Sequence, residues 1–406
     1  MHNITPYTSP TYFIYLLLFL LPIMIGLFYG KRFRVYETFA TLVILVITFF
    51  GGNMSQGFSL IAYVLVEMII VLGYLRYKRS PNGKNNFWVF FWAVILAIIP
   101  LAIVKIDPLM NNATISLFAF MGISYMTFKS VEMIMEIRDG AIKEIKPWEF
   151  LRFLLFFPTI TSGPIDRFRR FQKDVLNVPS RDEYIELLKS GTNKLMLGLL
   201  YKFIIGYVFG TLLLPKVSLL ALSYRDQAPL GISWALLAYM YVYSMYLFFD
   251  FAGYSLFAVA ISNFMGVKTP MNFNRPFQSV NIKDFWNRWH MTLSFWFRDF
   301  IYMRLMFFMM KKKLIKSRIT MANIGYVALF LIMGFWHGET WFYIVYGIFH
   351  ATAMITNDAW LRFKKKHRQS IPSNKFTKCL AIFITFNVVC FSFLIFSGFL
   401  NTLWFS

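Results

Sequence analysis

The sequence predicts an all-α integral membrane protein that crosses the bilayer many times. Hydrophobic residues make up 58% of the 406 positions, whereas charged residues make up only 15%. A soluble domain carries about 25% charged residues. Several uninterrupted apolar runs approach the ~20 residues that a helix needs to cross a bilayer core of about 30 Å. They lack the polar face of a water-soluble helix, so lipid is the expected solvent for much of the chain.

The apolar runs give the expected membrane spans. We expect about 11–12 transmembrane helices, because the runs near 150–160 and 250–310 can enter the bilayer without crossing it. No internal repeat or low-complexity linker is visible, so we expect one domain over residues 1–406. The candidate spans are residues 11–29, 36–50, 58–75, 87–104, 113–129, 193–214, 231–249, 252–266, 292–310, 319–336, 341–357 and 376–397.

Basic clusters between the runs predict the topology, because Lys and Arg near short loops mark the cytoplasmic side. The clusters at 31–34, 76–79, 311–318 and 364–368 are expected inside, and the basic-poor loops 51–57 and 105–113 outside. The first run is too long for a signal-peptide core and is followed, not preceded, by basic residues. We therefore expect it to remain as a span with the N-terminus outside the cell.

The net charge of +22 does not by itself indicate nucleic acid, because the basic residues lie between apolar runs and not along one face. We interpret them as topology signals and contacts with the lipid bilayer, and expect no nucleic-acid partner. Cys379 and Cys390 both lie in the last run, so neither a disulfide framework nor a metal site is expected. The chain contains no Walker loop, dinucleotide fingerprint or nucleophile elbow, which gives no support to nucleotide-driven transport.

Residues 129–184 differ from the spans, since they carry both charge signs around the apolar run 150–160 and the turn-forming Ser162, Gly163 and Pro164. This pattern predicts amphipathic cytoplasmic helices around a shallow re-entrant segment. Non-helical backbone at membrane depth requires protein or water to satisfy its polar groups. We therefore expect this segment, and residues 266–290, to be enclosed by the surrounding spans.

His337 is the first candidate for chemistry. The sequence GFWHGE at 334–339 interrupts about 40 otherwise apolar residues, and its glycines allow a bend that leaves the imidazole facing a cavity. An ionisable group in an apolar run costs free energy, and histidine reduces that cost by staying neutral. A polar turn at the membrane surface is the alternative interpretation.

His290 is the second candidate, at the end of DFWNRWH (284–290). On a continuous helix Trp286, His290, Leu293 and Phe297 share one face. Asp284 and Arg288 are four residues apart and form a possible ion pair on another face. An interfacial aromatic belt is the alternative, and the residues alone favour it.

Three further positions carry charge or a titratable group in unusual surroundings. Asp250, in an apolar run, requires a partner or a raised pKa, and a structural pair with Arg288 or Arg275 is favoured over a catalytic acid. His350 is expected to be a core histidine satisfied by a hydrogen bond. The turn GPIDR at 163–167, followed by Arg169 and Arg170, predicts either a phosphate-binding cluster at a cytoplasmic mouth or an ordinary basic loop.

Five segments together resemble the membrane-bound O-acyltransferase family, and within it the branch of teichoic acid D-alanyltransferases of Gram-positive bacteria. The resemblance covers nearly the whole chain, and the SGPIDR segment favours this branch over the alginate-acetylating one. The segments are FPTITSGPIDRF (157–168), FDFAGY (249–254), NFNRPF (272–277), DFWNRWH (284–290) and GFWHG (334–338).

The resemblance implies a helical ring around a thin centre, where a cytoplasmic tunnel and an external funnel meet near the catalytic histidine. It matches His337 to that catalytic histidine and His290 to the upstream functional histidine. The residues assigned to support the tunnel are Asp250, Trp286, Arg288 and Trp336.

The implied donor is D-alanine, held as a thioester on the 4'-phosphopantetheine arm of an acidic cytoplasmic D-alanyl carrier protein. The arm belongs to that partner, so no covalently bound cofactor is expected in this chain. The implied acceptor is a hydroxyl of lipoteichoic acid, reached directly or through a small membrane acyl acceptor. Other D-alanylation membrane proteins are expected partners.

The expected mechanism uses neutral His337 as general base toward the acceptor hydroxyl, with His290 stabilising the oxyanion or positioning the substrate. The expected carrier-docking surface is Arg304 with Lys311, Lys312 and Lys313, although topology and lipid contact also explain these residues. Two alternative functions remain open. One is an O-acetyltransferase for an exported polysaccharide, using acyl-CoA, and the other is a transporter or flippase without bond exchange.

Overall fold

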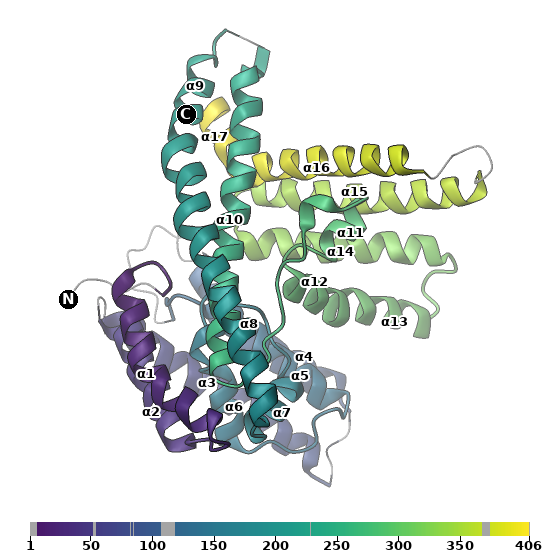
Figure 1. Ribbon diagram of the computed structural model, residues 1–406. Helices are drawn as coiled ribbons and strands as arrows, with labels where there is room; N and C mark the ends of the chain where they lie inside the picture. Colours follow the sequence, from purple (N-terminus) through teal and green to yellow (C-terminus); the bar gives the residue numbers. More distant parts are fainter. Residues whose placement is uncertain are drawn as a thin grey trace. The chain divides into compact units, whose positions relative to one another are not determined.

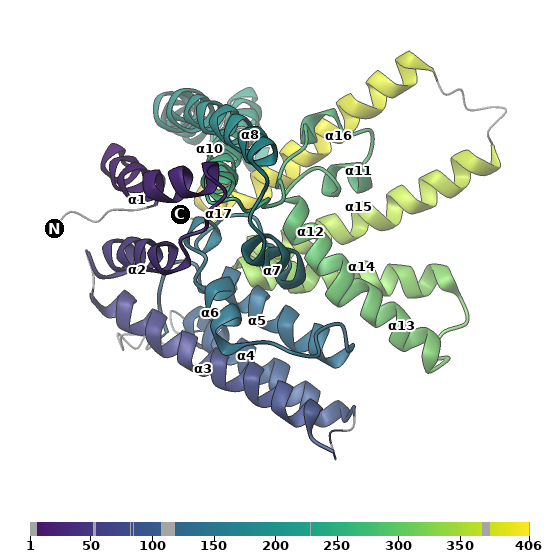
Figure 2. The same cartoon turned by 60° about the horizontal axis from the view of Figure 1, so that its bottom comes forward.

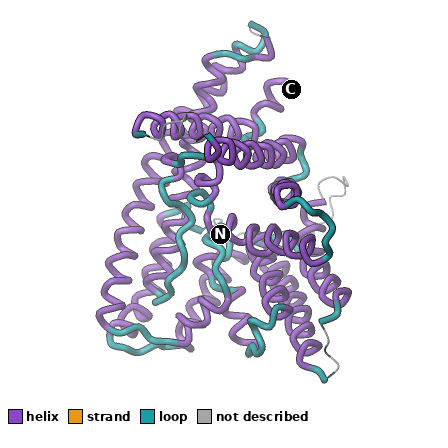
Figure 3. The backbone as a smooth tube through the Cα atoms, turned by 90° about the vertical axis from the view of Figure 1, so that its right-hand side faces the viewer, coloured by secondary structure: helices purple, strands orange, loops and turns teal. Residues whose placement is uncertain are grey.

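The computed structural model describes residues 6–51, 54–81, 83, 85–106, 118–227, 229–367 and 374–405. Within these ranges the chain consists of helices and loops (Figure 3). The prediction of an all-α membrane protein is confirmed. Seven of the described helices are long and apolar enough to cross a membrane, namely Thr11–Phe28, Met54–Arg79, Phe87–Ile106, Arg181–Ser223, Pro229–Phe264, Arg318–His337 and Lys375–Phe396.

The number of qualifying helices is lower than the 11–12 expected, for identifiable reasons. Residues 231–249 and 252–266 are not two spans, because α10 (Trp234–Phe264) continues through Gly253. Residues 292–310 are helical throughout, with a π-helical stretch at 298–302, but carry Arg298, Asp299 and Arg304. Helix α2 (Arg34–Phe50) has only 17 residues. Parts of the expected span 113–129, of the loops 51–57 and 105–113, and of the cluster 364–368 lie outside the described residues.

The contacts divide the chain into two compact units. The first comprises Met1–Gly198 and Tyr254–Pro270, and the second comprises Leu199–Gly253 and Met271–Ser406. The chain passes between the units within two continuous helical segments, at 198/199 and 253/254, and in a loop at 270/271. The expectation of one domain over residues 1–406 stays a prediction.

In the first unit, α3 packs against α2, α4, α5 and α6, and α3 and α4 run side by side (Figure 2). Residues 156–161 have no regular helix beyond one short turn, and all are buried. The expected enclosed non-helical segment is thus confirmed there. The helices of this unit are α1 (Pro10–Phe28), α2, α3 (Met54–Arg79), α4 (Phe87–Ile106), α5 (Ile123–Arg138), α6 (Pro147–Leu154), η2 (Phe157–Thr159), α7 (Phe168–Leu176), most of α8 (Arg181–Leu199) and the last part of α10.

In the second unit, α14, α15 and α16 run side by side (Figure 1). It also contains three π-helical stretches, and short helices join its longer ones. Its elements are η3 (Leu200–Ile205), η4 (Val208–Leu213), α9 (Leu214–Ser223), η5 (Pro229–Gly231), the first part of α10, η6 (Pro276–Gln278), α11 (Ile282–Trp286), α12 (Met291–Phe297), η7 (Arg298–Tyr302), α13 (Met303–Lys311), α14 (Arg318–His337), α15 (Trp341–Lys366), α16 (Lys375–Phe396) and α17 (Phe399–Phe405).

Two glycines allow the backbones of α14 and α15 to approach closely. A Cβ atom at Gly334 would lie 2.7 Å from the carbonyl oxygen of Tyr343, and one at Gly347 would lie 2.4 Å from that of Phe330. Small residues at such crossings are the usual way in which membrane helices pack tightly. This contact fixes the end of α14, where His337 lies, against the start of α15.

Candidate active site

His337 is the last residue of α14, and α15 begins four residues later at Trp341. The bend predicted from GFWHGE is therefore confirmed. The imidazole lies among aromatic rings, with centroids 4.6 Å from Trp336, 4.9 Å from Phe396 and 6.0 Å from Tyr346. It is only partly buried. Rings from three helices thus hold His337 in place while leaving part of it accessible.

His290 lies between α11 and α12 in a left-handed backbone conformation, with φ of +43°. The prediction that Trp286 and His290 share one helix face is wrong, because the helix ends at Trp286 and restarts at Met291. A non-glycine residue in this conformation costs of order 1–3 kcal/mol and persists only where its surroundings hold it. The strain at His290 marks a position that the fold constrains strongly.

The NFNRPF segment provides that constraint. The Met291 amide donates to the Asn272 carbonyl at 2.8 Å, and the Asn274 amide donates to the Arg288 carbonyl at 2.9 Å. The Thr292 hydroxyl also donates to the Asn272 side chain at 2.5 Å. Residues on both sides of His290 are therefore tied to one loop segment. Sequence reasoning noted this segment but assigned no role to Asn272.

The His290 side chain is 3% exposed and packs on the Phe251 ring at 4.8 Å. Burial, and to a lesser extent the nearby His337, lowers the pKa of His290 to about 3. An imidazole with this pKa is neutral at physiological pH. His290 can therefore donate or accept a hydrogen bond there but does not supply a cation.

A third histidine belongs to the same cluster. His350 is fully buried, and the Trp286 indole N–H donates to its Nδ1 atom at 3.2 Å. The expectation of a core histidine satisfied by a hydrogen bond is confirmed for that nitrogen. The Tyr346 ring lies 4.5 Å from His350 and 6.0 Å from His337. His337 lies within electrostatic range of both His290 and His350, so the second unit brings three imidazoles together.

The remaining predicted tunnel residues do not all join this cluster. Asp284 and Arg288 form the predicted ion pair, at 2.8 Å, but both line a solvent-open hollow with Lys283 and Lys378. The Trp336 ring lies edge-on to the His337 ring. The role of each of these residues in a tunnel remains a prediction.

Asp250 has a different partner from the two that were expected. It pairs with Lys202 in the π-helical stretch η3, not with Arg288 or Arg275. Lys202 lies in an apolar run, where a lysine requires a counter-ion. The interpretation of Asp250 as one half of a structural pair is thus confirmed, with the partner corrected.

The arginines that follow Gly163 are already neutralised. In the first unit Arg170 pairs with Asp166 and with Asp174, and Arg167 pairs with Glu132 at 3.3 Å. Arg169 pairs with Glu136 at 3.2 Å. These ion pairs favour the interpretation of this segment as an ordinary basic loop and not as a phosphate-binding cluster.

The expected docking residues lie at the end of α13. Lys311, Lys312 and Lys313 are exposed, and Arg304 lies over the Phe300 ring at 5.6 Å. Large apolar side chains are exposed beside them, at Met303, Phe307, Phe308, Met310 and Leu314. The surface therefore combines positive charge with exposed apolar area.

A cavity of about 200 Å³ extends from this side of the second unit toward the histidine cluster. Its lining includes Lys283, Arg298, which pairs with Asp299 at 2.9 Å, and the apolar side chains of Trp286, Phe330 and Met333. Trp286 and Phe330 both contact His350, with ring centroids 4.9 and 5.7 Å away. Basic side chains and an apolar lining suit an extended ligand with a phosphate at one end.

Comparisons with known proteins identify the family of the chain. A family model described as MBOAT, membrane-bound O-acyltransferase family, matches residues 123–396, which include all three histidines. A teichoic acid D-alanyltransferase of Lacticaseibacillus rhamnosus is 54% identical over 406 residues, covering all of both chains. One of Bacillus subtilis is 48% identical over 400 residues, covering 97% of this chain and 98% of that protein.

A more distant relative is named for a different transfer reaction. The peptidoglycan O-acetyltransferase of Helicobacter pylori is 27% identical over 350 residues, covering 80% of this chain and 59% of that protein. The family match spans well over half of the chain, and the two D-alanyltransferases align along nearly all of it. The chain is therefore a multi-pass membrane acyltransferase that belongs to the membrane-bound O-acyltransferase family.

Proposed function

We propose that this protein transfers D-alanine from the phosphopantetheine thioester of a cytoplasmic carrier protein to hydroxyls of teichoic acid. The acceptor is lipoteichoic acid, reached directly or through a small membrane acyl acceptor and other D-alanylation membrane proteins. Relatives at 48–54% identity named for teichoic acid D-alanyl transfer support this proposal. The observation that carries it in the structure is the cluster of one accessible and two buried imidazoles at the end of α14.

In the proposed reaction, neutral His337 removes the proton from the acceptor hydroxyl. The oxygen attacks the thioester carbonyl, the new C–O bond forms and the C–S bond breaks. The proton on His337 then returns to the departing thiolate, so atoms and charge balance. Base assistance of this kind is typically worth about 10²–10⁴-fold in rate. Because His290 is buried and neutral, its role is to donate a hydrogen bond to the oxyanion or to position the substrate.

The cavity beside Trp286 is the proposed route for the phosphopantetheine arm. Its phosphate is expected at Lys283 and Arg298, and the arm along Phe330 and Met333 toward the histidines. Positively charged side chains donate charge-assisted hydrogen bonds to the oxygens of a phosphate. The arm is supplied by the carrier protein and is the donor substrate.

The end of α13 is the proposed docking surface for the acidic carrier protein. By the positive-inside rule this basic cluster is expected inside the cell, and the cluster at 31–34 likewise predicts the N-terminus outside. Reversing charge at Lys311 and Lys312 to glutamate is expected to weaken carrier binding, more strongly at low salt. The same change at exposed Lys365 and Lys366 of α15 serves as the matched control. Equal binding by the two variants would remove this docking site from the account.

Two other functions predict different experimental results. An O-acetyltransferase for an exported polysaccharide would use acyl-CoA as donor, and the relative named for such a transfer shares only 27% identity. A transporter or flippase would move an acyl carrier or lipid-linked polymer without exchanging a bond.

Reconstitution in vesicles separates these three functions. Labelled D-alanine is supplied as the carrier thioester on one side and teichoic acid on the other. The proposal predicts an ester-linked label on the acceptor and a free carrier thiol. Transfer from acyl-CoA in place of the carrier would select the acetyltransferase, and movement of label without ester formation would select the transporter.

A further inference from the structure

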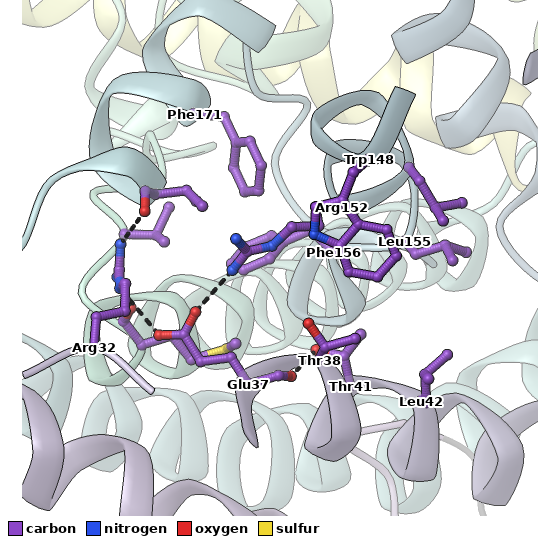
Figure 4. A pocket seen from close by; sticks show the side chains of 14 residues that line it. Arg32, Glu37, Thr38, Thr41, Leu42, Trp148, Arg152, Leu155, Phe156 and Phe171 are labelled. Carbon is purple, nitrogen blue, oxygen red and sulfur yellow. Dashed lines mark hydrogen bonds and ion pairs between the residues drawn. The ribbon is translucent and has the colours of Figure 1, made fainter. Parts of the chain in front are cut away.

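We propose that a pocket in the first unit, at the link between α1 and α2, binds the headgroup of an anionic phospholipid. The pocket has a volume of about 110 Å³. One water requires roughly 10–15 Å³ by this measure, so the pocket has room for a phosphate-sized group. Figure 4 shows Arg32 and Arg152 on either side of Glu37 within it.

The polar end of the pocket has more positive than negative charge. Glu37 pairs with Arg32 at 3.0 Å and with Arg152 at 2.8 Å. One negative carboxylate therefore faces two positive guanidinium groups. Burial, partly offset by Glu37 and reinforced by Arg32 and Arg34, lowers the pKa of Arg152 from its usual value. The uncompensated charge favours an anion at this position.

Arg152 has donors left for such an anion, whereas Arg32 has a structural role. The Arg32 side chain is 2% exposed and donates to the carbonyls of Asp174 and Met265 at 2.7 and 2.6 Å. Arg152 is 17% exposed, and its one hydrogen bond within the described residues goes from Nη2 to Glu37. Its Nε and Nη1 groups therefore remain available, in a planar fork suited to phosphate.

The rest of the pocket is apolar, and large apolar side chains on its lining are exposed. Its wall includes Leu155, Phe156 and Phe171, while Trp148 and Leu42 are each 50% exposed. The pocket lies where α1 ends at Phe28 and α2 begins at Arg34, which is the boundary of two apolar helices. Tryptophan is typical of this boundary, and basic pockets there bind anionic headgroups.

The occupant that fits is therefore amphipathic, with a phosphate at Arg152 and an acyl chain along the apolar wall. The residues that form this pocket are different from those proposed to carry out acyl transfer. Arg32 and Glu37 precede the region matched by the family model, and the three histidines belong to the second unit. Lipid binding can thus be measured without any assay of acyl transfer.

The test compares lipid retention by the full chain purified in detergent and supplied with equal phosphatidylglycerol and phosphatidylcholine. Native mass spectrometry gives the ratio of the two lipids retained, and thermal unfolding gives the stabilisation by each. The wild type is expected to prefer phosphatidylglycerol. In Arg152→Gln the ratio of retained phosphatidylglycerol to phosphatidylcholine is expected to fall about fivefold. This is the effect typical of one basic residue at an anionic membrane surface. Arg152→Lys is expected to keep most of it.

The matched control is Arg79→Gln, because Arg79 forms an exposed ion pair with Glu144. It should retain the wild-type preference. Arg152→Gln leaves Glu37 paired with Arg32, so the fold should persist, and the unfolding curve checks this. Equal retention of the two lipids by the wild type, or an unchanged ratio in Arg152→Gln, would overturn the proposal. Equal stabilisation by inorganic phosphate would identify a site for a soluble anion and would overturn the lipid assignment.

Discussion

Lys129 is a buried cation that closes the C-terminal end of α6. Its side chain is 1% exposed, and its ammonium donates to the Phe153 carbonyl at 2.9 Å and to the Thr159 hydroxyl at 3.4 Å. Phe153 is the penultimate residue of α6, so its carbonyl has no donor within the helix. Lys129 thereby joins α5 to the segment that precedes the SGPIDR turn.

Replacing Lys129 by methionine is expected to lower the free energy of unfolding by about 3–5 kcal/mol. The charge-assisted hydrogen bond to the Phe153 carbonyl accounts for about 1.5–3 kcal/mol. Asp166 and Glu132, both buried, interact electrostatically with the ammonium and lose that compensation. Removing one partner of a buried ion cluster typically costs about 3–5 kcal/mol.

The assay is a denaturant titration of the purified protein in mixed micelles, with Lys143→Met as control. Lys143 is exposed, so its replacement should change the unfolding free energy by less than about 0.5 kcal/mol. Adding Glu132→Gln to Lys129→Met should recover part of the loss, because without Lys129 the buried Glu132 carboxylate keeps only Arg167 as a counter-ion. Arg167, the partner of Glu132, is partly exposed and tolerates the change.

The reasoning would be refuted if Lys129→Met were as stable as Lys143→Met. It would also be refuted if the two changes at Lys129 and Glu132 were additive, since independent effects would mean that the side chains are not coupled.

Two further predictions concern the histidine cluster. The pKa of His290 is lowered to about 3, so the folded protein does not take up this proton while the unfolded chain does below about 6.5. Stability should therefore fall by about 2 kcal/mol more between pH 7 and pH 5 in the wild type than in His290→Gln, and parallel unfolding curves would disprove this. Trp286→Phe leaves Nδ1 of His350 without its donor and should cost about 1–3 kcal/mol, whereas Trp360→Phe, at an exposed position, should cost little. An equal loss in the two tryptophan variants would exclude a role for the Trp286 hydrogen bond.

The sequence was sufficient for features set by local chemistry. The apolar composition predicted the helices, and the interruption GFWHGE predicted the bend after His337. Asp284 and Arg288 formed the expected pair because a helical turn and a following turn bring positions four apart together. Each of these features depends on residues that are close along the chain.

Features set by distant contacts were not predictable in the same way. His290 was placed on a continuous helix, because nothing near it in the sequence reveals that Asn272 holds its backbone in a left-handed turn. Asp250 was matched to nearby arginines, although the fold pairs it with Lys202. The role of His350 required Trp286, 64 positions away, to be brought against it. In each case the partner comes from another element of the second unit.

The rate of acyl transfer in His337→Ala tests the central claim most directly. The measurement follows labelled D-alanine from a D-alanyl carrier thioester to acceptor hydroxyl in reconstituted vesicles, at equal amounts of folded protein. His367→Ala is the matched control, because His367 lies at the exposed C-terminal end of α15. Loss of the base is expected to slow His337→Ala by about 10²–10⁴-fold, with His367→Ala unaffected. Transfer at the wild-type rate by folded His337→Ala would contradict the account.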